Sequence, residues 1–238
     1  MRLPLLILTA VLLVSPALAQ ERTQYVLAIS WQPAFCETRP SRPECQSQTA
    51  DRFDSSHFAL HGLWPQPRSR DYCGVKIEDV AADERGAWSE LPAPDISDRL
   101  EDALAQAMPG TQSDLDRHEW IKHGTCYGSD AKDYFSDSLA MLEAVNGSAV
   151  AELFAASIGK RLTQSEIRAA FNGAFGPGAG ERVRVSCIDD GNRRLIDELT
   201  IGLTGEIRDS SDFAERILAA RPTEGGCDAG IVDQVGLQ

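Results

Sequence analysis

Residues 118–126, with the sequence HEWIKHGTC, constrain the chain most because they combine five reactive side chains with a helical pattern. At about 100° per residue, a helix capped by Asp114 carries its reactive groups on one face. Four of the five lie on this face: His118, Glu119, Lys122 and His123. Trp120 and Ile121 fall on the opposite face, which is expected to pack into a core. Gly124 is expected to end the helix, so the segment predicts a short helix that presents two imidazoles, a carboxylate and an ammonium group to a cleft.

Residues 57–66, with the sequence HFALHGLWPQ, form a second block that alternates as a β-strand does. The alternation places Phe58 and Leu60 on one side of the strand. The other side carries His57, Ala59 and His61. Gly62 and Pro65 are expected to end the strand. The chain has only four histidines and all of them lie in these two blocks, which indicates one shared site.

Two other interpretations of the histidines stay open at this point. A polar arc opposite an apolar arc is what any surface helix shows, so the helical block alone is also typical of an ordinary amphipathic helix. A metallohydrolase would use all four imidazoles as ligands, namely His57, His61, His118 and His123. The two histidines of the helix are five positions apart, however, whereas the zinc motif His-Glu-x-x-His spaces them by about four.

The two blocks together resemble the active-site blocks of the T2-type ribonucleases, which are secreted transferase-type endoribonucleases of fungi, plants and bacteria. The residues that carry the resemblance are His61-Gly62-Leu63-Trp64-Pro65 and His118-Glu119-x-x-Lys122-His123-Gly124-x-Cys126. The resemblance implies an α+β fold with a central, largely antiparallel sheet flanked by helices. It also implies cleavage of single-stranded RNA without a metal or other cofactor, first to 2′,3′-cyclic phosphate ends and then to 3′-phosphates. A binding or inhibitory protein that has lost the chemistry on the same scaffold is the alternative.

RNA carries its own nucleophile, the ribose 2′-OH, so cleavage needs a base for that proton, an acid for the leaving 5′-oxygen and positive groups near the phosphate. Histidine suits both proton roles because its ordinary pKa is about 6.5. The chemistry alone does not say which histidine is the base. The resemblance implies that His123 is the base and His61 the acid. It places His118 on the phosphate and puts Glu119 and Lys122 around the pentacovalent phosphorus.

Three further residues are candidates for contact with the RNA base. Trp64 is expected to stack on a base, with plain core packing as the alternative. Gln66 stands where some members of the family have an Asp that contacts the base edge, so no purine preference is implied. Tyr72 is a weaker candidate for the same pocket. His57 is outside the family pattern and is interpreted as incidental.

Six cysteines predict three disulfides and an oxidising compartment. Six cysteines allow about 15 connectivities, so the spacing alone does not choose among them. The resemblance implies the pairs Cys73–Cys126 and Cys187–Cys227. Cys36 and Cys45 are then left to close the small loop between them.

The first 19 residues have a basic start, a short apolar run and an Ala-x-Ala ending, which is typical of a secretory signal peptide. We therefore expect residues 20–238 to form a single exported domain, periplasmic or extracellular, monomeric and free of membrane spans. The net charge of −13 is unusual for a protein that depends on phosphate contacts. It favours transient catalysis on single strands over tight RNA binding.

The remaining pattern predicts strands near both ends of the chain and helices between them, which is typical of an α+β domain. Strands are expected at residues 25–31, 182–188 and 195–203, and helices at 96–108, 133–145, 150–158, 163–175 and 213–220. Residues 37–56 are expected to be a loop and residues 67–94 mostly irregular, and Trp31 is expected to be buried in the core.

Overall fold

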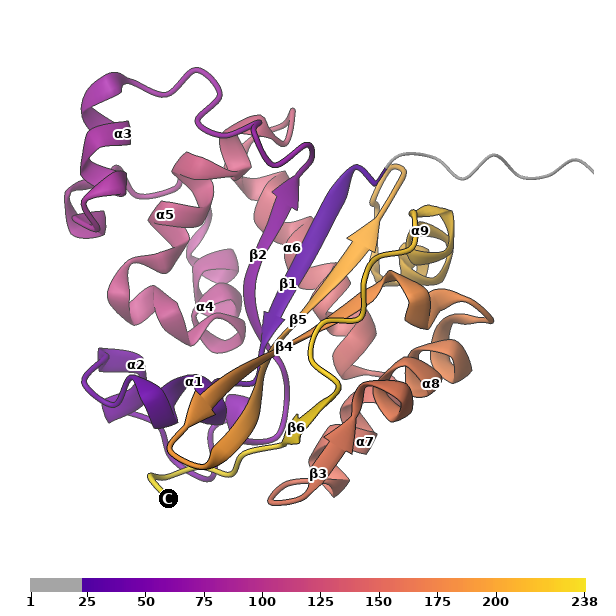
Figure 1. Ribbon diagram of the computed structural model, residues 1–238. Helices are drawn as coiled ribbons and strands as arrows, with labels where there is room; N and C mark the ends of the chain where they lie inside the picture. Colours follow the sequence, from indigo (N-terminus) through magenta and orange to yellow (C-terminus); the bar gives the residue numbers. More distant parts are fainter. Residues whose placement is uncertain (1–22) are drawn as a thin grey trace, which may run out of the picture.

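A six-stranded sheet lies at the centre of the molecule, with the strand order β2-β1-β5-β6-β3 and β4 paired to β5 (Figure 1). The computed structural model describes residues 23–238, so the signal peptide expected over residues 1–19 lies outside the described residues. The strands are β1 (Tyr25–Ser30), β2 (Ala59–Pro65), β3 (Arg161–Thr163), β4 (Val183–Asp190), β5 (Arg193–Leu203) and β6 (Ala229–Ile231). The β1–β2, β1–β5, β3–β6 and β4–β5 ladders are antiparallel and β5–β6 is parallel. The expected largely antiparallel α+β fold is therefore confirmed.

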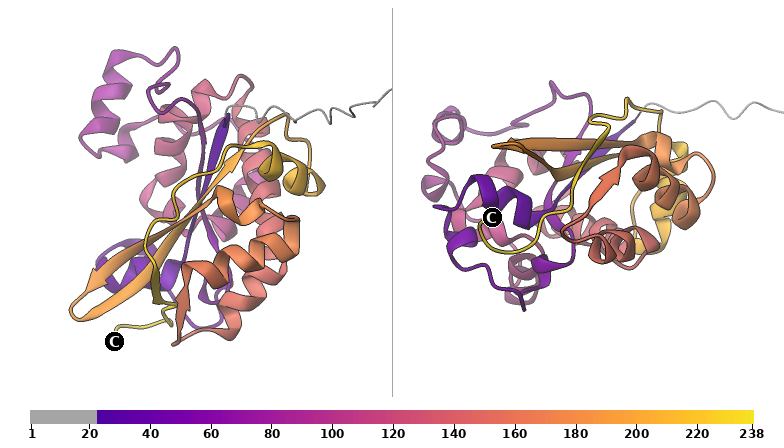
Figure 2. Two further views of the ribbon diagram at one scale, coloured as in Figure 1. Left: turned by 45° about the vertical axis from the view of Figure 1, so that its right-hand side comes forward. Right: turned by 60° about the horizontal axis from the view of Figure 1, so that its bottom comes forward.

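Helices flank this sheet (Figures 1 and 2). They are α1 (Gln32–Thr38), α2 (Pro43–Gln46), α3 (Ile77–Glu84), α4 (Asp98–Ala107), α5 (Leu115–Lys122), α6 (Ala131–Asn146), α7 (Ala149–Ala156), α8 (Gln164–Phe175) and α9 (Phe213–Ala219). Helix α6 packs on β1 and β2, and α9 packs on β5. Within residues 23–238 no single helix is long and apolar enough to cross a membrane, and α6 and α7 meet that test only as a pair bent by 62°.

The core gathers aromatic side chains around Trp31, which is fully buried as the sequence predicts. The ring of Trp31 lies 5.6 Å from that of Phe58 and 5.4 Å from that of Phe154. Its indole nitrogen donates a hydrogen bond of 2.7 Å to the backbone oxygen of Asp233. Because a buried indole N–H needs a partner, this bond also ties the C-terminal segment to the strand that begins the sheet.

Strand β2 differs from the expectation in a way that matters for the site. The strand does not end at Gly62 but continues to Pro65. Along its ladder with β1, Ala28 pairs with Gly62 and Ile29 pairs with Leu60, so His61 is the extra residue of a β-bulge. A bulge redirects the side chain it carries, and it breaks the strict alternation that had placed Ala59 and His61 on one side.

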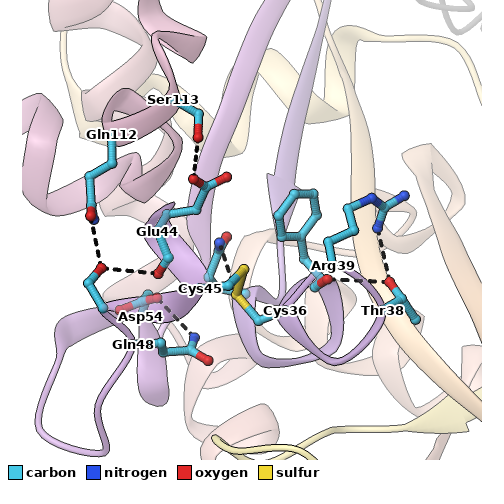
Figure 3. The surroundings of a disulfide bond; sticks show 12 residues. Cys36, Thr38, Arg39, Glu44, Cys45, Gln48, Asp54, Gln112 and Ser113 are labelled. Atoms are coloured by element: carbon cyan, nitrogen blue, oxygen red, sulfur yellow. Dashed lines mark hydrogen bonds between the residues drawn. A yellow bond between two sulfur atoms is a disulfide. The ribbon is translucent and has the colours of Figure 1, made fainter. Parts of the chain in front are cut away.

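Residues 37–56 are more ordered than the loop that the sequence predicts. Helix α2 begins at Pro43, because proline fits the first turn of a helix where its missing N–H is not needed. Figure 3 shows how the segment is held, with Ser113 donating to the carboxylate of Glu44 and Gln48 donating to Asp54 beside the Cys36–Cys45 disulfide. The two short helices α1 and α2 are thus fixed against the rest of the molecule.

Residues 67–94 are mostly irregular, as expected, but they also contain helix α3 and a 3₁₀ turn at Trp88–Glu90, which the sequence did not predict. Two helical turns were missed because only a small apolar cluster, formed by Ala82, Leu91 and Ile121, marks their buried side. The α3 helix packs against α5 and delivers a carboxylate to the site described below.

Several local predictions are confirmed. The helices expected at residues 96–108 and 163–175 are α4, where Ser97 accepts a hydrogen bond from the first turn, and α8, where Thr163 and Glu166 form a capping box. All three disulfides have the expected partners: Cys36–Cys45, Cys73–Cys126 and Cys187–Cys227. Asp114 does occupy the N-cap position of α5, but in a left-handed conformation and without a side-chain capping bond.

Candidate active site

The two histidine blocks meet across one cleft of about 390 Å³ between β2 and α5. The cleft is lined by His61, Trp64, Pro65, Gln66, Arg68, Asp71, His118, Glu119, Lys122 and His123. All five residues predicted to carry the chemistry are therefore brought together, along with Trp64 and Gln66. Tyr72 does not line this cleft, and His57 lies elsewhere, stacked on Phe53 with ring centroids 4.2 Å apart.

His61 projects from the bulge of β2 and contacts carboxylates on both sides. Its Nδ1 lies 2.6 Å from Oε2 of Glu198 on β5, and its Nε2 lies 3.7 Å from Oε1 of Glu119. Burial lowers the pKa of His61, but the hydrogen bond to Glu198 and the charges of Glu119 and Asp197 outweigh burial and raise that pKa above its ordinary value. The imidazolium form of His61 is therefore favoured.

Glu119 lies beneath the cleft and is 1% exposed, rather than fully open to it as the helical pattern suggested. Its Oε2 accepts a hydrogen bond of 2.9 Å from the indole of Trp64, while its Oε1 has no hydrogen-bond partner among the described residues. Burial raises the pKa of Glu119 to about 7. Since a Cβ on Gly62 would lie 1.9 Å from Oε2 of Glu119, only glycine at position 62 leaves room for this carboxylate.

His118 is held by two contacts that the sequence did not reveal. Its Nδ1 lies 2.7 Å from Oδ1 of Asp83 on α3, and its ring stacks on Trp88 at 4.6 Å. Burial lowers the pKa of His118 more than the bond to Asp83 raises it. Tyr72 donates a hydrogen bond of 2.8 Å to the other oxygen of Asp83, so its hydroxyl supports His118 rather than facing the cleft.

His123 caps the C-terminal end of α5. Its Nδ1 is buried, and Oδ1 of Asp71 lies 3.4 Å away without hydrogen-bond geometry. Burial lowers the pKa of His123 to about 3, with further lowering from the charges of Lys122, His118, His61 and Arg68. The neutral imidazole is favoured, and Nε2 is the nitrogen left to meet a ligand.

Trp64 stands between the two outer histidines. Its ring centroid lies 5.3 Å from that of His61 and 5.6 Å from that of His123. Gln66 turns its amide back to the carbonyl oxygen of Trp64, at 3.3 Å. The indole thus forms the floor between the imidazoles, and the one hydrogen bond that it donates goes to Glu119 rather than to a ligand.

Sequence reasoning missed the carboxylates that support the histidines, Glu198 and Asp83, and two charged residues of the cleft, Arg68 and Asp71. The chain has 36 Asp and Glu residues, so no local pattern singles these out. The four-histidine metal set is not assembled, because His57 is not at the cleft. A different triad, His118, Glu119 and His123, offers donor atoms within 4.8 Å of one another.

The model of the Ribonuclease T2 family matches residues 22–214. The chain is similar to Ribonuclease I of Escherichia coli (strain K12), with 27% identity over 235 residues that cover 90% of this chain and 87% of that protein. It is also similar to a ribonuclease of Aeromonas hydrophila, with 34% identity over 119 residues, 49% of this chain and 43% of that protein.

Two solved structures share the fold. RNase NT in complex with 5′-AMP matches with a TM-score of 0.54 and 20% identity, covering 89% of this chain and 98% of that one. The T2 ribonuclease Actibind matches with a TM-score of 0.52 and 17% identity, covering 92% of this chain and 90% of that one. With the family match and the geometry of the cleft, the conclusion is that this chain belongs to the ribonuclease T2 family.

Proposed function

We propose that the protein is an exported endoribonuclease that cleaves single-stranded RNA by metal-independent transphosphorylation. The observation that carries the proposal is the opposite tuning of two imidazoles in one cleft. The pKa of His61 is raised by the carboxylates around it, and the pKa of His123 is lowered to about 3. Two titratable groups whose environments separate their pKa values are suited to act as acid and base.

In the first step, Nε2 of His123 takes the proton of the 2′-OH while O2′ attacks phosphorus. The P–O5′ bond breaks, and Nε2 of His61 gives its proton to O5′. The product carries a 2′,3′-cyclic phosphate. Water then opens that ring to a 3′-phosphate with the proton roles reversed, and each proton transfer typically contributes roughly 10² to 10⁴ in rate.

The groups on α5 stabilise the charge that builds on phosphorus. Lys122 supplies a positive charge at the cleft wall, where it acts without reorganisation. The negative phosphate favours the imidazolium form of His118, whose Nδ1 proton Asp83 accepts, so that Nε2 donates to a phosphate oxygen. Glu119, with a pKa raised to about 7, lies beneath the same atoms and contributes a proton donor when it is protonated.

Room for a nucleoside exists on each side of the phosphate. On one side Trp64 and Gln66 line the cleft, and we assign them the base contact because aromatic faces stack on unpaired bases. On the other side of His61 a second pocket of about 200 Å³ is lined in part by Ser30, Gln32 and Leu60. Tyr72 has no place in this scheme as a base contact, because its hydroxyl is engaged by Asp83.

An exported, monomeric enzyme fits the remaining features. Three disulfides that use all six cysteines suit the periplasm or the extracellular space. A net charge of −13 keeps non-specific adhesion to RNA weak. Arg68 and Lys122 still place positive charge at the cleft itself.

One observation favours a second candidate, a metal-dependent hydrolase, because His118, Glu119 and His123 form a donor set that suits zinc. Incubating residues 20–238 with single-stranded RNA in EDTA separates the two. The transphosphorylation proposal expects undiminished cleavage and cyclic phosphate ends that precede 3′-phosphates. Loss of all cleavage in EDTA, restored by added zinc, would establish the second candidate instead.

A further inference from the structure

The shortest side-chain contact of the proposed catalytic histidines joins His61 to a residue of β5, the strand on the far side of β1. Nδ1 of His61 and Oε2 of Glu198 are 2.6 Å apart, although the residues are 137 positions apart in the chain. Glu198 is on β5 and His61 on β2, and β1 lies between these strands. Neighbouring strands are about 4.8 Å apart, so two side chains must reach across roughly twice that distance over β1.

Two bulges make this contact possible. On β1, Ser30 pairs with Glu198 of β5, and His61 of β2 lies opposite the step from Ile29 to Ala28, so the two side chains leave the sheet a short step apart along β1. His61 is the extra residue on β2, and the shift between Ser186 and Cys187 makes Asp197 the extra residue on β5. The contact is therefore built into the backbone of the sheet and does not depend on a flexible loop.

The charged groups around His61 come from several segments. Arg39, Arg42 and Glu44 line the pocket on one side of His61, and Arg68 and Asp71 line the cleft on the other. Strand β5 contributes Glu198 and Asp197, and helix α5 contributes Glu119, His118, Lys122 and His123. Glu198 is the one of these that holds Nδ1 of His61, whereas Glu119 lies at Nε2, the nitrogen that faces the cleft. A carboxylate at Nδ1 keeps a proton there and leaves the proton of Nε2 for transfer.

We propose that Glu198 is the positioning residue of the general acid, holding the His61 imidazolium so that its Nε2–H points at the leaving 5′-oxygen. The inference rests on the proposed function and adds a residue to it. When His61 gives its Nε2 proton to O5′, it becomes neutral with the proton still on Nδ1, and Glu198 continues to accept the hydrogen bond of that Nδ1–H. The raised pKa of His61 agrees with this role.

The Asp83–His118 pair offers a matched control, because it has the same chemistry at nearly the same distance, 2.7 Å. Burial outweighs the carboxylate there and lowers the pKa of His118. A carboxylate that is hydrogen-bonded to a histidine therefore does not by itself make that histidine a general acid. We therefore expect Glu198 to assist departure of the leaving group through His61, whereas Asp83 supports the contact of His118 with the phosphate.

The test compares Glu198→Gln with Asp83→Asn on two substrates, a dinucleoside monophosphate and a uridine 3′-phosphate ester of p-nitrophenol. The nucleoside alkoxide needs a proton to leave, and p-nitrophenolate does not. We expect Glu198→Gln to lower kcat/KM by about 10²-fold on the dinucleotide, within the range of a general acid, and to leave the p-nitrophenyl ester nearly unchanged. Asp83→Asn should lower both rates by similar factors.

Two further readouts separate positioning from simple structural support. The alkaline limb of the pH profile of kcat/KM on the dinucleotide should move to lower pH in Glu198→Gln. The double variant with Glu198→Gln and His61→Ala should be little slower than His61→Ala alone. Equal losses on both substrates, or an unmoved alkaline limb, would overturn the inference. Turnover of the p-nitrophenyl ester reports that the variant is folded, whereas a wild-type protein that cleaves neither substrate in EDTA would refute the proposed function instead.

Discussion

The two walls of the cleft carry the same type of side chain in opposite electrostatic surroundings. The sheet wall presents His61 from a bulge, beside Glu198 and Asp197, and its pKa is raised. The helix wall presents His123 next to Lys122, and its pKa is lowered to about 3. The comparison teaches that the direction in which the pKa of a histidine shifts here is decided by which backbone element supplies its neighbours.

The largest expected effect comes from removing either of the two imidazoles, one on each wall. His61→Ala and His123→Ala should each lower kcat/KM on RNA by roughly 10² to 10⁴, because each removes one of the two proposed proton-transfer groups. On the p-nitrophenyl ester the losses should diverge, with His123→Ala still severe and His61→Ala mild. The same rate loss on that ester in both variants would mean that the walls do not have distinct roles.

The next effect concerns the charge of the helix wall. Lys122→Gln should lower kcat by about 10² to 10³, the usual cost of removing one group that stabilises transition-state charge. It should also raise the pKa of His123, because the charge of Lys122 helps to lower it. Since the base must be neutral, the acid limb of the pH–rate profile then moves to higher pH. An acid limb at unchanged pH would show that Lys122 does not lower the pKa of His123.

A smaller effect is expected where the two walls touch. A methyl group at position 62 would collide with Glu119, so Gly62→Ala should displace that carboxylate and the indole of Trp64. We expect a loss of up to about 10² in kcat/KM, since small misplacements in a site cost that much. Gly173→Ala is the matched control, because a Cβ there meets nothing within 4 Å; activity like wild type in both variants would contradict the tight fit.

The smallest effect concerns the support of His118. Tyr72→Phe removes the hydroxyl that donates to Asp83 and should weaken activity by about fivefold, in line with roughly 1 kcal/mol for one hydrogen bond. The loss should appear equally with every RNA sequence tried. A change in base preference in this variant would show instead that Tyr72 contacts the base.

Local signals in the sequence were sufficient for the parts of the fold that depend on neighbouring residues. The capping box at Thr163, the helix that carries Lys122 and the clustering of the histidines are all short-range features. The bulge at His61 and the carboxylate of Glu198 were not predictable in this way. They depend on the register of strands distant in the sequence, and an acidic residue carries no mark of the histidine that it will meet.

The pKa values of the histidines could not be predicted from the sequence for the same reason. His118 and His123 lie on one helix face that looks open to solvent in a helical projection, yet both are largely buried. Burial is the first cause of the lowered pKa at each of them, and burial is a property of the assembled walls.

The most direct test of the opposite pKa shifts of His61 and His123 is an NMR titration of the histidine rings in residues 20–238. The variants His61→Ala and His123→Ala assign the two resonances. The account predicts that His61 titrates above 6.5, the ordinary value for histidine, and that His123 titrates well below it. A His123 ring that takes up its proton at a higher pH than His61 would contradict the assignment of base and acid.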